Sequence, residues 1–208
     1  MEILDQLAVA LGFATLAGLN LYLTVLITGL VIRFDLISLA PQYEQLSILG
    51  SDVVLIGAGI FFVLEFFSDK VPWVDSLWDS VHTLIRPVGG GLLALQTLGT
   101  MDPAFSVVLA MLAGGATLLT HGVKAGTRLA INTSPEPVSN VAASVTEDVA
   151  VLGGLGLMAW NPLVAGLFFL TFLGLSAWLT PKLFRRSKAF LWLMLHKVKS
   201  VFSKDKQT

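Results

Sequence analysis

The chain has 208 residues, of which 55% are hydrophobic and only 13% are charged, and its formal net charge is −1. A soluble domain carries about a quarter charged residues, so this composition excludes an ordinary soluble globular protein. The chain has no cysteine, which excludes disulfides and thiolate metal sites. We expect neither a cofactor nor a nucleic-acid partner.

Long apolar stretches recur along the chain, and stretches of about 20 residues with few charges are typical of membrane-spanning helices. In chain order we predict spans over residues 7–32, 53–67, 73–98, 104–131, 138–160 and 163–179. No Lys or Arg precedes Arg33, so we expect the first span to be retained rather than cleaved as part of a signal peptide. The predicted fold class is an all-α, polytopic transmembrane helix bundle of about six spans.

The stretch 73–98 is polar at its start and apolar at its end, and two structures fit it. It contains "RPVGGG", where Pro87 removes a helical hydrogen bond and the following glycines loosen the next turn. The stretch is then either a spanning helix kinked at Pro87 or a re-entrant hairpin, which is tolerated only where protein buries it. We favour the kinked helix.

The distribution of basic residues predicts the orientation. Eight of the 13 Lys and Arg residues follow Pro181. By the positive-inside rule this end is cytoplasmic, and six spans would place both termini in the cytoplasm. We therefore divide the chain into a transmembrane domain, 1–180, and a basic, amphipathic cytoplasmic tail, 181–208. The tail either lies on anionic lipid or serves only to fix the orientation. The expected location is a bacterial inner (plasma) membrane.

Polar residues form stripes on four of the predicted helices. Residues on one helical face recur every three or four positions, and "DSLWDSVHTLIR" places four such residues on a single face. These stripes fall in the cytoplasmic half of the membrane, where a charge facing lipid costs several kcal/mol. We therefore expect the stripes to line one shared polar cavity that opens inward between "SDKVP" and "NTSPEP". The candidate site residues are Glu65, Asp69, Asp75, Asp79, His82, Arg86, His121, Lys124, Arg128, Asn132, Glu136, Asn140, Glu147 and Asp148.

A weak internal repeat accompanies the stripes. A shift of 65 residues aligns Pro72 with Pro137, and it also aligns a polar residue at 75 with one at 140. Internal repeats that place broken helices around a midplane site are common in transporters. Some of the matches are expected by chance in a chain rich in Gly and Leu.

Three segments carry a family resemblance: "GLNLYLTVLITGLVIR", "EFFSDKVPWVDSLWDSVHTLIRP" and "HGVKAGTRLAINTSPEPVSNVAASVTED". Together they resemble the bacterial and plant multi-pass membrane proteins catalogued as domain of unknown function 4126. The resemblance covers most of the chain up to about residue 160. It implies an integral membrane protein and no particular activity.

The residues themselves favour a transporter or channel for a small ion. Among the candidate residues and the adjoining Lys70, Asp and Glu outnumber Lys and Arg by three, which favours a cation as the transported ion. The two histidines suggest proton coupling. Asn20 and Thr24 in the first span would supply further oxygen ligands. We expect membrane lipid and a small ion or solute as partners, with a homo-oligomer left open.

Two alternatives remain. One is a structural or assembly protein in which the polar residues form a buried ion-pair network. The other is an enzyme or flippase that holds a lipid phosphate with Arg86, Lys124 and Arg128. The chain lacks the nucleophile elbow, the phosphate-binding loop and the H-E-x-x-H motif, so the sequence gives little support for an enzyme. The pair Asp79 and His82 matches half of a di-metal site, and metal binding stays open.

Overall fold

A computed structural model describes residues 2–99, 102–132 and 137–204 of the chain, and all regular structure in these ranges is helical. The elements are α1 (Glu2–Arg33), the 3-10 helix η1 (Pro41–Gly50), α2 (Asp52–Ser68), α3 (Pro72–Leu98), α4 (Pro103–Ile131), α5 (Pro137–Trp160) and α6 (Pro162–Lys204). The all-helical fold class is confirmed, and the predicted bounds of the apolar segments agree with most of these helices.

Fewer helices than predicted have the length and composition of a membrane span. By length and composition, four helices in the described ranges could cross a membrane: α1, α4, α5 and the first part of α6. A fifth span results if η1 and α2, which meet at an angle of 64°, together form one broken span. The polar stripe of α3 keeps that helix out of this set. The prediction of about six spans is therefore not confirmed, and the internal repeat stays a prediction.

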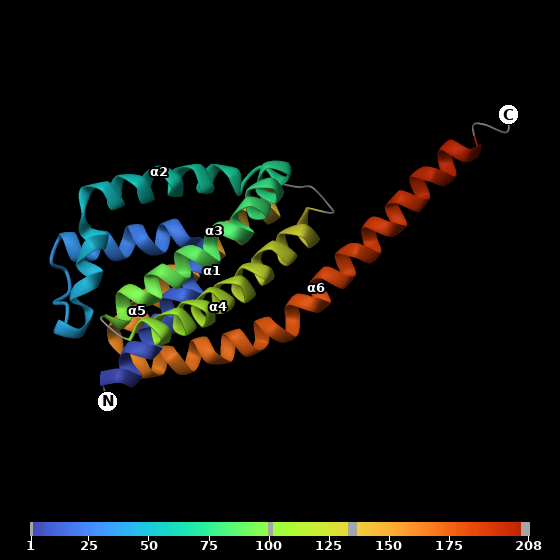
Figure 1. Cartoon of the computed structure of the whole chain (residues 1–208). Helices are drawn as coiled ribbons and strands as arrows, with labels where there is room; N and C mark the ends of the chain where they lie inside the picture. The colour runs from blue at the N-terminus through green and yellow to red at the C-terminus, as the bar shows by residue number, and fades with distance from the viewer. Residues whose placement is uncertain (1, 100–101, 133–136, 205–208) are drawn as a thin grey trace.

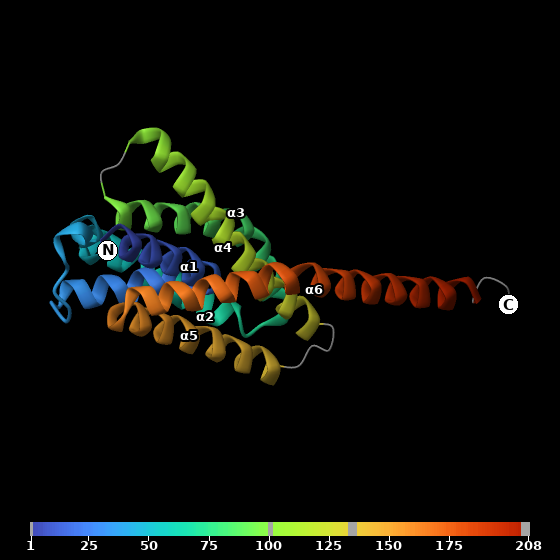
Figure 2. The ribbon, with the colours of Figure 1, turned by 90° about the horizontal axis from the view of Figure 1, so that it is seen from below.

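The helix α1 is broken at Asn20, whose backbone is extended, with φ −149° and ψ 99°. Before the break, Gly12 lies against Met158 near the end of α5, and Asn20 itself reaches Asp148 further along that helix. After the break, the chain follows α2 back toward its start, where Gly29 approaches Leu55. The two halves of α1 thus form a helical hairpin, which both views of the ribbon show (Figures 1 and 2).

This hairpin occupies the centre of the bundle. Its first half contributes more buried apolar residues than any other described helix, with Phe13, Leu16 and Ala17 at most 3% exposed. The other helices surround it and expose large apolar side chains outward, such as Leu84 at 77% and Met111 at 72%. A broken helix at membrane depth is tolerated only where protein buries it, and the surrounding helices meet this requirement for α1.

The alternative of a re-entrant hairpin over residues 73–98 is wrong, because α3 is helical through "RPVGGG" from Pro72 to Leu98. The favoured kink at Pro87 stays a prediction. The glycines of this motif serve close packing instead. A side chain at Gly89 would collide with Leu21 of α1, and one at Gly90 would collide with Thr117 of α4. The broken helix is therefore α1, at Asn20, and not the stretch 73–98.

The termini lie at opposite ends of the bundle (Figure 1). This arrangement differs from the prediction of two termini on one side, because the two halves of α1 fold back on each other at Asn20. At the C-terminal end, α6 continues through Pro181 to Lys204 and projects beyond the other helices (Figure 2). The division into a membrane domain and a tail stays a prediction.

Candidate functional site

The candidate residues of α2, α3, α4 and α5 converge on the tip of the α1 hairpin. We call this group, together with Asn20, the tip cluster: Asn20, Glu65, Asp69, Asp75, Asp79, His82, Arg86, His121, Lys124, Arg128, Asn132, Asn140, Glu147 and Asp148. Of the predicted site residues, only Glu136 lies outside the described residues. The polar stripes therefore face one another as expected, and this arrangement by itself assigns them no function.

Asn20 is placed so that it caps the second half of α1. Its side-chain oxygen accepts a hydrogen bond from the backbone N–H of Leu23 at 2.9 Å, which is the geometry of a helix N-cap. Its amide nitrogen donates to Asp148 at 3.0 Å. Asp148 is eleven residues into α5, or about 17 Å along a helix that rises 1.5 Å per residue. The hairpin tip thus lies near the middle of the bundle.

Two cationic side chains satisfy the carbonyl groups that the break leaves free. Nη1 of Arg86 donates to the carbonyl oxygens of Gly18 and Leu19 at 2.8 and 2.9 Å. Nζ of Lys124 also donates to the Leu19 carbonyl, at 3.2 Å. The C-terminal end of a helix carries partial negative charge, so both cations complement the end of the first half-helix.

Lys124 and Arg128 connect the acids of α2 with an acid of α5. Nζ of Lys124 lies 3.0 Å from Glu65, 3.3 Å from Asp69 and 3.3 Å from Glu147. Arg128 binds the two carboxylate oxygens of Glu147 with two nitrogens, at 3.2 and 2.7 Å, and also reaches Asp69 at 3.3 Å. Such paired contacts hold a carboxylate in a defined orientation.

Arg86 joins α3 to the same network through α2. Its guanidinium forms an ion pair with Glu65, and both side chains are wholly buried. It also lies 4.0 Å from Asp79 on its own helix. Burying the two charges of such an ion pair costs desolvation free energy, and removing one partner costs more because it leaves an uncompensated buried charge.

The cluster holds more negative than positive groups. Among the described residues, six carboxyl groups face three cationic side chains: Glu65, Asp69, Asp75, Asp79, Glu147 and Asp148 against Arg86, Lys124 and Arg128. Four of these acids have a buried oxygen without a hydrogen-bond partner, and in Asp79 both oxygens lack one. Asp79 is only 4% exposed. Since buried charge must be compensated, the cluster requires protons or a further cation.

Both histidines of the cluster are hydrogen-bonded through both ring nitrogens. Arg86 donates to Nδ1 of His121 at 3.1 Å, so the hydrogen of this imidazole is on Nε2, which lies 3.0 Å from the Asp79 carbonyl. Nδ1 of His82 donates to the Trp78 carbonyl at 2.8 Å, and its Nε2 lies 2.9 Å from the hydroxyl of Tyr22. Their predicted role in proton coupling stays a prediction.

The cluster extends to the end of the bundle that carries the C-terminus of α6. There Asn132 donates to Asp75 at 3.1 Å and accepts from Asn140 at 2.8 Å. Lys70, in the turn between α2 and α3, donates to the Phe66 carbonyl at 2.8 Å. Partial burial lowers the pKa of the Lys70 amine, while the neighbouring Asp69 acts to raise it.

None of the three cavities in the described part of the chain corresponds to the predicted open polar cavity, which stays a prediction. These cavities have volumes of about 430, 230 and 570 Å³, and no charged residue lines any of them. The polar stripes instead fill the space between the helices with ion pairs. The described residues also contain no group of three His, Asp or Glu side chains placed to hold a metal ion.

Sequence reasoning found the charged residues but missed the hairpin tip that they surround. Asn20 was expected only as an oxygen ligand, and Tyr22 was not expected at all. A signal was present, because Asn is a strong N-cap residue and a weak helix former inside a long apolar stretch. The proline and glycines of "RPVGGG" were a stronger local signal for a re-entrant break, but α3 is helical there and the break lies at Asn20.

Comparison with known families identifies the chain. Residues 7–182 match the family described as Domain of unknown function (DUF4126). The protein belongs to this family. No curated protein and no solved structure matches the chain. The earlier resemblance is thus confirmed, and for this member of DUF4126 the chemistry has to be argued from the site itself.

Proposed function

We propose that this protein is a membrane transporter or channel for a small cation, which binds among the carboxylates of the tip cluster. The observation that carries the proposal is the excess of buried carboxyl groups over cations, with both oxygens of Asp79 unpartnered. Ionisable residues at membrane depth commonly form ion paths or proton relays. Protons and the transported cation would compete for the same unpartnered oxygens.

The broken helix supports the same proposal. In many transporters a discontinuous helix presents free carbonyl groups near the middle of the membrane, where they coordinate cations. Here Lys124 reaches both the Leu19 carbonyl and Glu65, so its ammonium group takes a position that suits a cation. We propose that Lys124 acts as a tethered counter-ion, which an arriving cation displaces from these oxygens.

We further propose an inner-membrane location with the tip cluster on the cytoplasmic half. Eight of the 13 basic residues follow Pro181, and the positive-inside rule places that end of the bundle in the cytoplasm. The N-terminus lies at the other end of the bundle (Figure 1), so only the C-terminus would be cytoplasmic.

The test is ion flux into proteoliposomes, measured with a pH dye and a panel of monovalent and divalent cations. Wild-type protein should give a cation-dependent flux, and Asp79→Asn should abolish it. Because the Asp79 oxygens accept no hydrogen bond, this substitution should leave the thermal unfolding temperature nearly unchanged. The matched control is Glu44→Gln, which changes an exposed acid of η1 outside the tip cluster and should retain flux.

The absence of flux for every cation, with wild-type protein intact, would refute the proposal. So would full flux in Asp79→Asn. Loss of flux together with loss of folding would instead assign Asp79 a structural part, and Lys124→Met then provides a second test of the cation path.

A structural or assembly role is the second candidate, because the paired contacts between Arg128 and Glu147 leave no open space between them. This role predicts that Glu147→Arg unfolds the protein and that adding Arg128→Glu restores folding. The contacts do not favour lipid-phosphate chemistry, since carboxylates already hold each of the three buried cations.

A further inference from the structure

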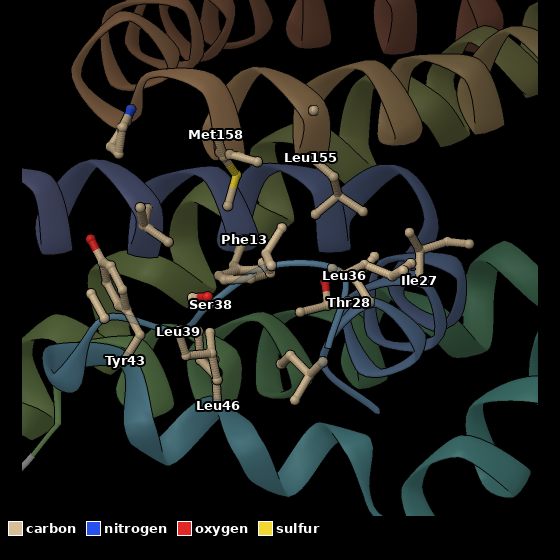
Figure 3. A pocket seen from close by; sticks show the side chains of 18 of the residues that line it. Phe13, Ile27, Thr28, Leu36, Ser38, Leu39, Tyr43, Leu46, Leu155 and Met158 are labelled. Atoms are coloured by element: carbon tan, nitrogen blue, oxygen red, sulfur yellow. The ribbon is translucent and has the colours of Figure 1, made fainter. Parts of the chain in front are cut away.

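A second candidate binding site lies at the open end of the α1 hairpin. A cavity of about 430 Å³ is enclosed there by both halves of α1, the connection to η1, η1 itself and the end of α5. Figure 3 shows its wall, in which Phe13 and Met158 face Leu39 and Leu46. Ligand pockets typically have volumes of about 300–1,000 Å³ and mainly apolar walls.

Two buried hydroxyl groups on this wall have no hydrogen-bond partner: Oγ1 of Thr28 and the phenol oxygen of Tyr43. Buried polar groups are nearly always paired, so each of these atoms calls for a partner. Figure 3 shows the two side chains at separate places along the cavity, with Phe13 and Leu39 between them. A molecule that satisfies both hydroxyls needs at least two hydrogen-bonding oxygens.

The conformation of Thr28 makes its free hydroxyl unusual within this chain. Other threonines of α1 donate to the carbonyl four residues earlier: Thr15 to Leu11 at 2.8 Å and Thr24 to Asn20 at 2.7 Å. Thr28 makes no such bond, although it lies in the same helix and is only 9% exposed. Its hydroxyl is therefore available to the cavity.

A comparison with another cavity shows that this is more than a packing gap. The cavity of about 570 Å³ between α1, α3, α4 and α6 is larger, but only Leu, Ala and Gly residues line it. Its side chains offer a ligand no hydrogen bond. The cavity with Thr28 and Tyr43 combines apolar walls with these two hydroxyls and that of Ser38, and no charged residue lines it.

We infer that this cavity binds a neutral lipid-like molecule whose polar part carries carbonyl or hydroxyl oxygens. The apolar wall excludes a water-soluble metabolite, and the lack of a lining cation disfavours a phosphate or carboxylate headgroup. Leu152 on the α5 wall is 47% exposed, so this apolar wall also reaches the outer surface of the bundle. This inference does not depend on ion transport.

The experiment measures ligand-induced thermal stabilisation of the purified full-length protein in detergent, since a ligand that binds the folded state raises its unfolding temperature. The probes are decylubiquinone and dioctanoylglycerol, which are neutral and carry carbonyl oxygens, with decanoate as the charged comparison. We expect at least one neutral probe to stabilise the protein and decanoate to have no effect. Which neutral probe binds decides between a quinone and a glycerolipid.

Three variants locate the binding. Thr28→Val and Tyr43→Phe each remove one hydroxyl and should weaken binding about three- to tenfold, the value of one hydrogen bond. Gly156→Phe should abolish it, because a side chain there enters open space on the cavity wall, with no atom within 4 Å of its Cβ. Gly174→Phe on α6 meets equally open space and lines none of the three cavities, so it should bind normally.

The inference would be overturned if decanoate stabilised the protein as much as the neutral probes do. It would also be overturned if neither neutral probe stabilised the protein. Binding that is unchanged in both hydroxyl variants would do so as well. If Gly156→Phe fails to fold, the hydroxyl variants still decide, because they remove atoms that have no partner in the protein.

Discussion

The two ends of the α1 hairpin contrast in how they use buried space. At the tip, charged side chains from four helices fill the space and pair with one another, as Lys124 does with Glu65 and Asp69. At the open end, the same two half-helices enclose an apolar cavity with two unpartnered hydroxyls. The tip therefore has more carboxyl groups than cations, whereas the open end has an unfilled cavity. One fold-back at Asn20 creates both.

The largest effect should come from breaking the tip. Arg86→Met removes one of the two cations that pair with Glu65, the other being Lys124, and it removes a donor to the Gly18 and Leu19 carbonyls. A buried ion pair that loses one member costs about 3–5 kcal/mol of folding free energy. Thermal or denaturant unfolding in detergent measures the loss.

The matched control for this change is Arg33→Met. Arg33 pairs with Asp52 at 2.9 Å, but the two side chains are 52% and 73% exposed, so the loss should be at most about 1 kcal/mol. Equal destabilisation by the two substitutions would show that burial of the tip cluster is not what makes its ion pairs matter.

A smaller effect is expected where the tip packs against α4. A Cβ on Gly18 would lie 2.6 Å from the Thr117 carbonyl oxygen, so Gly18→Ala should cost about 1–3 kcal/mol by overpacking. Gly174→Ala, with no atom within 4 Å of its Cβ, should be nearly neutral in the same unfolding assay. A neutral Gly18→Ala would mean that the tip can move away from α4.

The cap at the break is expected to contribute less again. Asn20→Ala removes the bond to the Leu23 N–H and the bond to Asp148, and loss of an N-cap costs about 0.5–2 kcal/mol. Asn20→Ser keeps a capping oxygen and should recover most of the stability. If Ala and Ser behave alike at this position, the cap does not hold the break.

The smallest effect should be found at the open end and would sharpen the comparison. Thr28→Val removes a hydroxyl that has no partner, so the ligand-free protein should unfold within about 0.5 kcal/mol of wild type. Thr97→Val removes an equally buried hydroxyl that donates to Leu93 at 2.9 Å, and it should cost about 1 kcal/mol. A marked loss in Thr28→Val without ligand would reveal a protein partner for this hydroxyl.

Much of the site followed from helical spacing alone. Asp79 and Arg86 lie on one face of α3, and Lys124 and Arg128 lie on one face of α4, because residues three, four or seven apart share a helical face. The cost of exposing these charges to lipid then required the faces to meet. The sequence could not show whether the faces would enclose water or contact each other directly, since this depends on the distance between the helices.

Composition and periodicity by themselves determined an all-helical membrane protein with charged faces turned inward, because both properties are local and repeat along each helix. The tertiary structure decided where the chain reverses. Arg86 and Lys124, from distant parts of the chain, help to stabilise the break at Asn20 because they donate to the freed carbonyls. In the same way, Pro87 and its glycines remain helical because α1 and α4 pack closely against them. Long-range contacts therefore overrode the local signals at both positions, and the resulting hairpin positions both the tip cluster and the cavity.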